Sequence, residues 1–178
     1  FSLLERNGIE VDLIARPRFG GHDEEDSPFL RGMEDRRISA DLGFQMEWEG
    51  ERFSLRLTPV TDVLDRSGGQ EVAFDVLLPL QRGPFRIEPR IGAVWLSADS
   101  ADYYYGVRPE EARPGRPAYE PGATVNLTAG VFGFAPVGRK WVAQGFLEVE
   151  RLGEELQDSP IVDQDLGFTA FAGLSYQF

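Results

Sequence analysis

The chain has 178 residues, no cysteine, and 18 basic against 30 acidic side chains, which gives a formal net charge of −12. The missing cysteines exclude disulfide scaffolds, cysteine-ligated zinc and thiol catalysis, and the acidic balance argues against nucleic-acid binding. No run approaches the roughly 18 apolar residues of a membrane-spanning helix. The length is typical of one domain, so residues 1–178 are predicted to form a single domain.

Apolar and polar residues alternate with a period of two through most of the chain. In residues 38–48 the apolar positions are Ile38, Ala40, Leu42, Phe44, Met46 and Trp48. A helix would bring the intervening polar side chains onto the apolar stripe, so strands are favoured. In chain order we predict strands over residues 9–18, 38–48, 53–63, 72–81, 85–95, 123–131, 141–149 and 166–178. No amphipathic helix is predicted.

Strand length and loop length together indicate a membrane protein. Most predicted strands run for about 10–13 residues, the length that crosses a bilayer at a tilt, whereas strands of soluble proteins average about 5–6. Tight turns at residues 6–8, 49–51, 82–84 and 135–138 alternate with longer links at 20–36, 64–70, 98–121 and 152–165. Outer-membrane β-barrels have short periplasmic turns and long extracellular loops. We therefore predict an all-β, antiparallel transmembrane β-barrel of the Gram-negative outer membrane.

The aromatic residues suit the same fold. Six lie beside predicted short turns or at the C-terminus, where they would form one interfacial ring: Trp48, Phe53, Phe85, Trp141, Tyr176 and Phe178. Trp95 and Phe168 are candidates for the opposite ring. The alternative interpretation is that these aromatic residues are scattered through a core.

The polar faces of the strands are expected to line the interior of the barrel. The named candidates for charged interior residues are Asp75, Arg86, Glu88 and Arg90. A dry core could not hold such charges unpaired, because buried charge without a partner is costly. We expect Arg86, Glu88 and Arg90 to form a ladder of salt bridges. An ion-pair network without transport is the favoured interpretation, and a selectivity-determining channel lining is the other.

Both ends of the chain carry information. The terminal strand ends in Leu174, Tyr176 and Phe178, which resembles the assembly signal that outer-membrane proteins present to the barrel-assembly machinery. Strand addition at a sheet edge, with alternate side chains entering pockets, gives this signal a physical basis. Residues 1–5 look like the tail of a further strand. Because bacterial barrels close with an even number of strands, eight full strands here predict 10–12 in a complete protein with additional upstream sequence.

No catalytic, cofactor or metal site is predicted. His22 is the single histidine and lies in an acidic stretch of a predicted loop, where an ordinary loop residue is the favoured interpretation. That acidic stretch could bind a divalent cation loosely or bridge to lipopolysaccharide through one. In the longest loop, Tyr103 and its two neighbours accompany Arg108, Arg113 and Arg116. Contact with a partner or glycan and simple loop packing both remain open for this stretch.

Two separated motifs resemble those of one protein family. Tyr104, Tyr105, Gly106 and Val107 form the first, Ser159 and Pro160 belong to the second, and the terminal strand adds to the likeness. Together they resemble the MipA/OmpV family, whose members are outer-membrane barrels longer than this chain at the N-terminus. The resemblance implies a scaffold that links a lytic murein transglycosylase to a bifunctional peptidoglycan synthase. It supplies no catalytic residue.

Three functions follow from this reading. The first is the non-enzymatic scaffold, in contact with the lipid bilayer and lipopolysaccharide. The second is a diffusion channel for small solutes with a charged interior. The third is a soluble, lipocalin-like barrel, which requires the apolar faces to point inward and the charges to point outward.

Overall fold

The computed structural model describes residues 2–19, 21–25 and 27–176. Ten strand segments form one antiparallel sheet. They are β1 (Ser2–Arg6), β2 (Ile9–Arg18), β3 (Ser39–Glu49), β4 (Ser54–Asp62), β5 (Gln70–Leu77), β6 (Leu80–Arg82), β7 (Phe85–Leu96), β8 (Thr124–Val137), β9 (Trp141–Arg151) and β10 (Leu166–Tyr176). The all-β fold predicted from the alternation is confirmed, and the predicted strand over residues 9–18 matches β2 at both ends.

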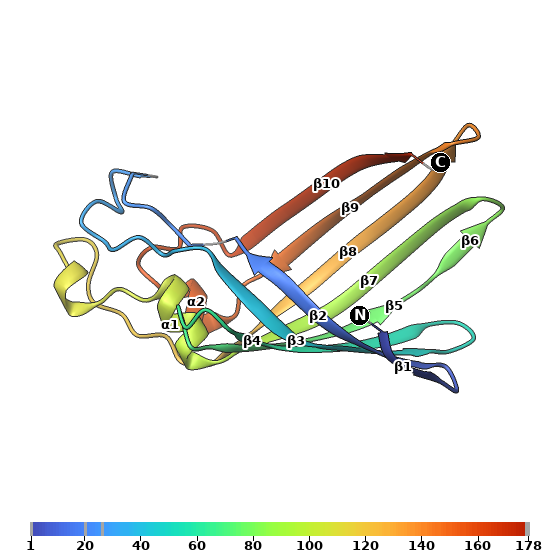
Figure 1. The fold of residues 1–178 in the computed structure, drawn as a ribbon. Helices are drawn as coiled ribbons and strands as arrows, with labels where there is room; N and C mark the ends of the chain where they lie inside the picture. Colours follow the sequence, from blue (N-terminus) through green and yellow to red (C-terminus); the bar gives the residue numbers. More distant parts are fainter. Residues whose placement is uncertain (1, 20, 26, 177–178) are drawn as a thin grey trace.

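Successive strands are neighbours throughout the sheet, in the order β1-β2-β3-β4-β5-β7-β8-β9-β10. The sheet is curled, with the long loops gathered at one end and the short turns at the other (Figure 1). β1 and β10 form its two edges, and they do not pair with each other over the residues described. This architecture fits an outer-membrane β-barrel whose wall is not closed by these strands.

Local backbone chemistry explains where several strands end. Asn7 and Gly8 both have positive φ, at 55° and 75°, as a two-residue hairpin of this type requires. Gly138, with φ of 76°, turns the chain between β8 and β9, so β8 runs to Val137 and the predicted turn at 135–138 was placed too early.

The predicted strand over residues 72–81 is interrupted. β5 ends at Leu77, and β6 begins at Leu80 and pairs with the same strand, β7. Pro79 lies in the gap, where its missing N–H removes one donor from the hydrogen-bond ladder. The Leu78 N–H still donates to the carbonyl of Pro89 at 2.9 Å, so the two segments act as one arm of a hairpin.

Two α-helices lie in loops where none was predicted: α1 (Ala98–Tyr105) and α2 (Glu154–Gln157). The buried residues of α1 are Ser100 and Ala101, so the helix has no apolar stripe that a search for amphipathic helices could find. Its start is set by Ser97, whose Oγ accepts from the N–H of Ser100 at 3.3 Å. A short 3₁₀ helix, η1 (Pro109–Glu111), follows. Among the described residues, no helix combines the length and the apolar composition needed to span a bilayer.

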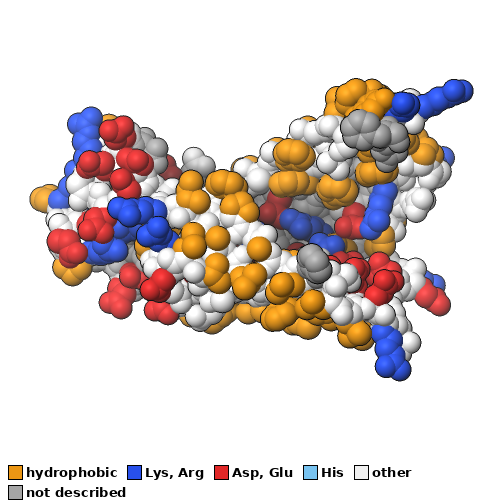
Figure 2. All heavy atoms as spheres, in the orientation of Figure 1, with side chains coloured by type: hydrophobic (Ala, Val, Ile, Leu, Met, Phe, Trp, Pro, Cys, Tyr) orange, Lys and Arg blue, Asp and Glu red, His pale blue; other side chains and the backbone are white. Residues whose placement is uncertain are grey.

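The orientation of the side chains excludes the soluble, lipocalin-like alternative. Leu42 and Leu127 are 41% and 57% exposed on the outer face, whereas their strand neighbours Asp41 and Asn126 are 2% exposed. Figure 2 shows hydrophobic side chains over the outside of the strands and charged side chains within the hollow between them. The apolar faces therefore point outward, as a lipid-facing wall requires.

The aromatic residues predicted to form the interfacial rings are on the exposed surface. Pairs of them meet edge to face across neighbouring strands or turns: the Trp48 and Phe53 ring centroids are 5.6 Å apart, and those of Trp141 and Tyr176 are 5.0 Å apart. Phe85, Trp95 and Phe168 are also exposed. Phe178 lies outside the described residues.

Candidate functional site

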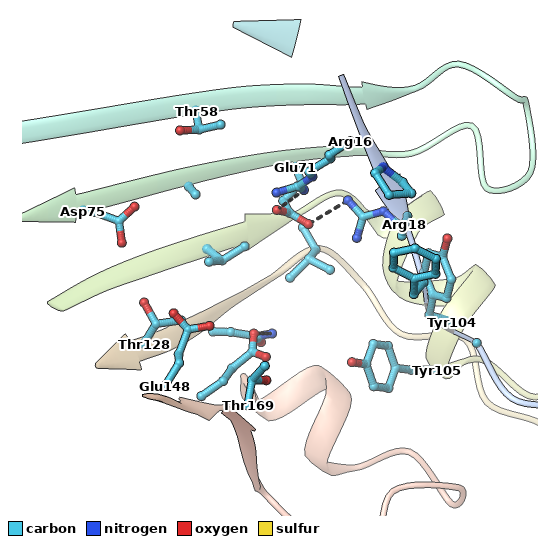
Figure 3. A pocket seen from close by; sticks show the side chains of 18 of the residues that line it. Arg16, Arg18, Thr58, Glu71, Asp75, Tyr104, Tyr105, Thr128, Glu148 and Thr169 are labelled. Atoms are coloured by element: carbon cyan, nitrogen blue, oxygen red, sulfur yellow. Dashed lines mark hydrogen bonds and ion pairs between the residues drawn. The ribbon is translucent and has the colours of Figure 1, made fainter. Parts of the chain in front are cut away.

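The concave face of the sheet encloses a cavity of about 940 Å³. Its walls are inward-facing side chains from the strands β2 to β5 and β7 to β10, and Tyr104 and Tyr105 of α1 face it from the long-loop end (Figure 3). Charged and hydroxyl side chains predominate on these walls. This interior, lined by polar side chains and covered at its long-loop end, is the candidate functional site.

The long-loop end of the interior holds a cluster of two arginines and two carboxylates. Arg16 donates to Asp41 at 3.1 Å and to Glu71 at 2.6 Å. Arg18 donates to the same two partners at 2.6 and 2.8 Å. Asp41 and Glu71 are 2% and 10% exposed at their side chains, so each cation is needed to compensate a buried anion. The cluster joins β2, β3 and β5 across the interior.

Deeper in the interior, ion pairs continue between facing strands. Arg56 pairs with Glu47 at 2.8 Å, and Arg90 of β7 pairs with Glu148 of β9. Asp75 lines the same part of the cavity (Figure 3). Glu47 and Glu148 at this level are thus each paired with an arginine, on the adjacent strand and two strands away respectively.

The predicted ladder of Arg86, Glu88 and Arg90 takes a different form. Arg86 donates to Glu88 at 2.6 Å near the short-turn end, with Arg86 53% exposed at its side chain. Arg90 turns instead to Glu148, two strands along the sheet. Residues 88 and 90 lie on the same face of β7, but Arg90 pairs with a carboxylate of β9, a contact that the sequence alone does not indicate.

Two tyrosines of α1 cover the interior at its long-loop end. The guanidinium carbon of Arg18 lies 5.7 Å from the centre of the Tyr104 ring, which ties the helix to the charged cluster below it. Burial raises the pKa of Tyr104 to about 12, although Arg18 opposes the shift. Burial likewise raises the pKa of Tyr105, with the nearby charge of Glu150 adding to it. Both phenols therefore stay neutral at physiological pH.

The loops over this end form a packed cap, comprising residues 21–38, apart from residue 26, and residues 97–123. A buried ion pair joins the two loops: Arg36 donates to both carboxylate oxygens of Glu111 at 3.1 and 3.0 Å, with side chains only 1% and 3% exposed. The backbone N–H groups of Glu34 and Arg108 also donate to that carboxylate, each at 2.9 Å. Burial alone would raise the pKa of Glu111, but these donors outweigh it and hold the pKa below its ordinary value.

The two motifs that carry the family resemblance meet in the structure, although some 50 residues separate them. The Ser159 hydroxyl donates to the carbonyl of Tyr105 at 2.6 Å. Val107 is buried and exchanges backbone hydrogen bonds with Tyr119 at 2.8 and 2.9 Å. Gly106 ends α1, where a Cβ would collide with the carbonyl oxygen of Asp102. Pro160 follows directly after Ser159. The Ser159 hydrogen bond thus joins the loop after α2 to the cap at the end of α1.

The remaining residues singled out from the sequence occupy other places. Leu174 and Tyr176 are exposed on the outer face of β10, at the edge of the sheet. His22 borders the cavity at its long-loop end. Within residues 2–19, 21–25 and 27–176, no group of three or more His, Cys, Asp or Glu side chains is placed to hold a metal ion.

Sequence reasoning missed several of the residues that organise the site. Arg16, Arg18 and Glu71 were not singled out, and neither was the pair of Arg36 and Glu111, whose members lie 75 residues apart. The alternation does place Arg16 and Arg18 on the inner face of β2. It carries no information on which acidic residue each would meet.

Comparison with known proteins identifies the chain's relatives. The family described as MltA-interacting protein MipA matches residues 1–178. The MltA-interacting protein of Escherichia coli (strain K12) is 30% identical over 152 residues, which cover 84% of this chain and 60% of that protein. The putative outer membrane protein YiaT of the same strain is 29% identical over 81% of this chain and 59% of its own length. Outer membrane protein OmpV of Vibrio cholerae serotype O1 is 25% identical over 88% and 61%.

These matches confirm the resemblance inferred from the motifs and support the predicted outer-membrane location, because the relatives are named as outer membrane proteins and the all-β fold fits a barrel there. The chain spans about 60% of the length of these relatives. No solved structure matches it.

Proposed function

Because this chain belongs to the MltA-interacting protein MipA family, we propose that it acts as a non-enzymatic scaffold of the outer membrane. Its partner is a lytic murein transglycosylase of the kind that names the family, and a bifunctional peptidoglycan synthase joins the assembly. Lipopolysaccharide surrounds the long-loop end, and the barrel-assembly machinery recognises the terminal strand through Leu174, Tyr176 and Phe178.

The proposal rests on the paired charges of the interior and on the loops that cover its long-loop end. Arg16, Arg18 and Arg90 are paired with carboxylates on other strands of the sheet, and the long-loop end is covered by Tyr104, Tyr105 and a cap held by the Arg36–Glu111 pair. A diffusion channel needs a solvated path that continues through both ends. Paired charges under a packed cap instead favour a rigid body that presents its surfaces to partners.

The short-turn end is the surface proposed for the murein enzyme. In an outer-membrane barrel the short turns face the periplasm, where murein lies. Glu49 at the end of β3, Glu51 in the turn that follows and Glu5 of β1 are all exposed, and they outnumber the exposed Arg6 and Arg52 at the same end. A basic surface on the partner would complement this acidic rim.

A binding experiment with the full-length protein tests the proposal. In mild detergent, the protein is expected to retain the organism's lytic transglycosylase. The variant Glu51→Lys should weaken retention at least several-fold at low salt. Glu110→Lys, an exposed glutamate in the loop cap at the opposite end, is the matched control and should not. Equal retention by both variants, or none by the unmodified protein, contradicts the proposal.

Conductance in planar bilayers separates the scaffold from the channel. The scaffold should give little or no current, because the cap obstructs one end of the interior. Stable, stepwise currents from protein whose folding has been verified by heat-dependent gel mobility would contradict a non-conducting scaffold and support the channel instead.

A further inference from the structure

We infer that the outer face of β7 to β10 binds one anionic phospholipid of the leaflet at the short-turn end. This surface is distinct from the interior and from the acidic rim of β1, β3 and β4. A groove of about 970 Å³ runs across these four strands. Its outward-facing members by strand alternation are Phe85, Ile87, Val131, Gly133, Ala135, Ala143, Gly145, Leu147, Ala172 and Leu174.

The groove follows from the sizes of side chains brought into register. Gly133 pairs with Gly145, which pairs with Ala172, and Ala135 pairs with Ala143. Larger side chains bound this low area, with Leu147 and its partner Val131 on the side away from the turns. Residues 131 to 135 advance roughly 14 Å along the strand. The depression therefore spans neighbouring strands and is apolar, so it offers space for an acyl chain.

The next row of side chains toward the short turns is aromatic. Val137 pairs with Trp141, and Trp141 pairs with Tyr176. Trp141 and Tyr176 are both exposed and contact each other edge to face. Amphipathic rings of this kind lie at the level of lipid headgroups. The apolar groove thus ends where the interface of the bilayer is expected.

Beyond the aromatic row, the chain presents cations. Arg139 and Lys140 form the β8–β9 turn, and Lys140 places its Nζ 5.4 Å from the centre of the Tyr176 ring. Arg82 lies at the neighbouring turn between β6 and β7. No ion pair of these three side chains occurs within the described part of the chain. Figure 2 shows basic side chains at the tip of the β8–β9 hairpin.

The order of groove, aromatic row and cations matches the order of acyl chain, interface and headgroup in one lipid. The local positive charge contrasts with the net charge of −12 of the whole chain, which points to an anionic headgroup rather than a zwitterionic one. Each cation near a membrane surface strengthens the attraction to anionic lipid by roughly five-fold in affinity. The groove that receives the acyl chain restricts the lipid to one position on the outer face of β7 to β10.

Quenching of tryptophan by brominated lipid tests this inference. The chain has three tryptophans, so Trp48→Phe with Trp95→Phe leaves Trp141 as the reporter beside the groove. Phosphatidylglycerol brominated on its acyl chains is titrated into the full-length protein in detergent, with brominated phosphatidylcholine as the comparison. We expect half-maximal quenching at a several-fold lower concentration of phosphatidylglycerol.

Matched variants assign the effect to its parts. Arg139→Gln with Lys140→Gln should remove the preference for phosphatidylglycerol, and adding inorganic phosphate should not displace the lipid. Ala143→Leu should weaken quenching by both lipids, whereas Ala129→Leu, also outward-facing but outside the groove, should not. Equal quenching by the two lipids in the unmodified background, or a preference that survives loss of both cations, overturns the inference. The two turn variants keep the test decisive if Ala143→Leu fails to fold.

Discussion

The buried Arg36–Glu111 pair is predicted to hold the two long loops of the cap together, and Glu111→Gln is the change that tests it. The substitution keeps the shape of the side chain but leaves the Arg36 guanidinium, 1% exposed, without its counter-charge. Removing one partner of a buried pair costs about 3–5 kcal/mol. That cost corresponds to a roughly hundred-fold to several-thousand-fold increase in opening of the cap.

Amide hydrogen exchange measures this opening directly. The N–H groups of Glu34 and Arg108 donate to the Glu111 carboxylate, and the N–H of Tyr119 donates to Val107 within the same cap. All three should exchange faster in Glu111→Gln by about the factor given above, while amides of β8 and β9 should keep their rates. Faster exchange confined to the cap would show that the cap opens while the sheet stays folded.

An exposed ion pair in the same cap supplies the control. Arg108 pairs with Glu34, with side chains 37% and 71% exposed. Exposed pairs contribute about 0–1 kcal/mol, so Arg108→Gln should change exchange in the cap by less than about tenfold. The reasoning is refuted if Glu111→Gln exchanges like the unmodified protein, or if Arg108→Gln has the larger effect.

Three further results are expected. Because the pKa of Glu111 lies below its ordinary value, Glu111 stabilises the cap above about pH 4.5, and this stabilisation is lost as pH falls through the lowered pKa. Protection of the cap amides from hydrogen exchange that increases on acidification would contradict this. Tyr104, with a pKa of about 12, should ionise at higher pH than an ordinary tyrosine in a titration followed by ultraviolet absorbance. Its contribution to stability should be lost as pH rises above about 10. A titration curve that is unchanged in Tyr104→Phe would contradict this assignment. Gly106→Ala should destabilise the end of α1 by about 0.5–3 kcal/mol, because the new Cβ would meet the Asp102 carbonyl. Proteolysis within residues 97–123 should then be faster. Unchanged cleavage would contradict the close approach of the two groups.

Strand positions could be predicted because each strand carries its own signal. In β3 every outward residue from Ala40 to Trp48 is apolar, and the inward positions hold Asp41, Gln45 and Glu47. A strand buried on both faces would lack this contrast. Turns could be predicted for the same reason, because neighbouring residues such as Asn7 and Gly8 by themselves indicate a two-residue hairpin.

The arrangement of the site could not be predicted because it depends on contacts between distant segments. Arg18 meets Glu71 across 53 residues, and Arg36 meets Glu111 across 75. Helix α1 escaped detection for a different reason. It is short and buries Ser100 and Ala101, so its stability comes from the Ser97 cap and from packing rather than from a periodic apolar face. The two segments of the family motif likewise meet only in the folded chain, where the Ser159 hydroxyl donates to the carbonyl of Tyr105.

The central claim is that apolar side chains of the strands face lipid while polar ones face an enclosed interior. The chain has no cysteine, so single cysteines at Leu127 and Thr128, adjacent residues on opposite faces of β8, can each carry a spin label. In the protein reconstituted into bilayers, we predict that the label at 127 is more accessible to molecular oxygen and the label at 128 to a water-soluble nickel complex. The reverse assignment, or equal accessibility at both positions, would contradict the account.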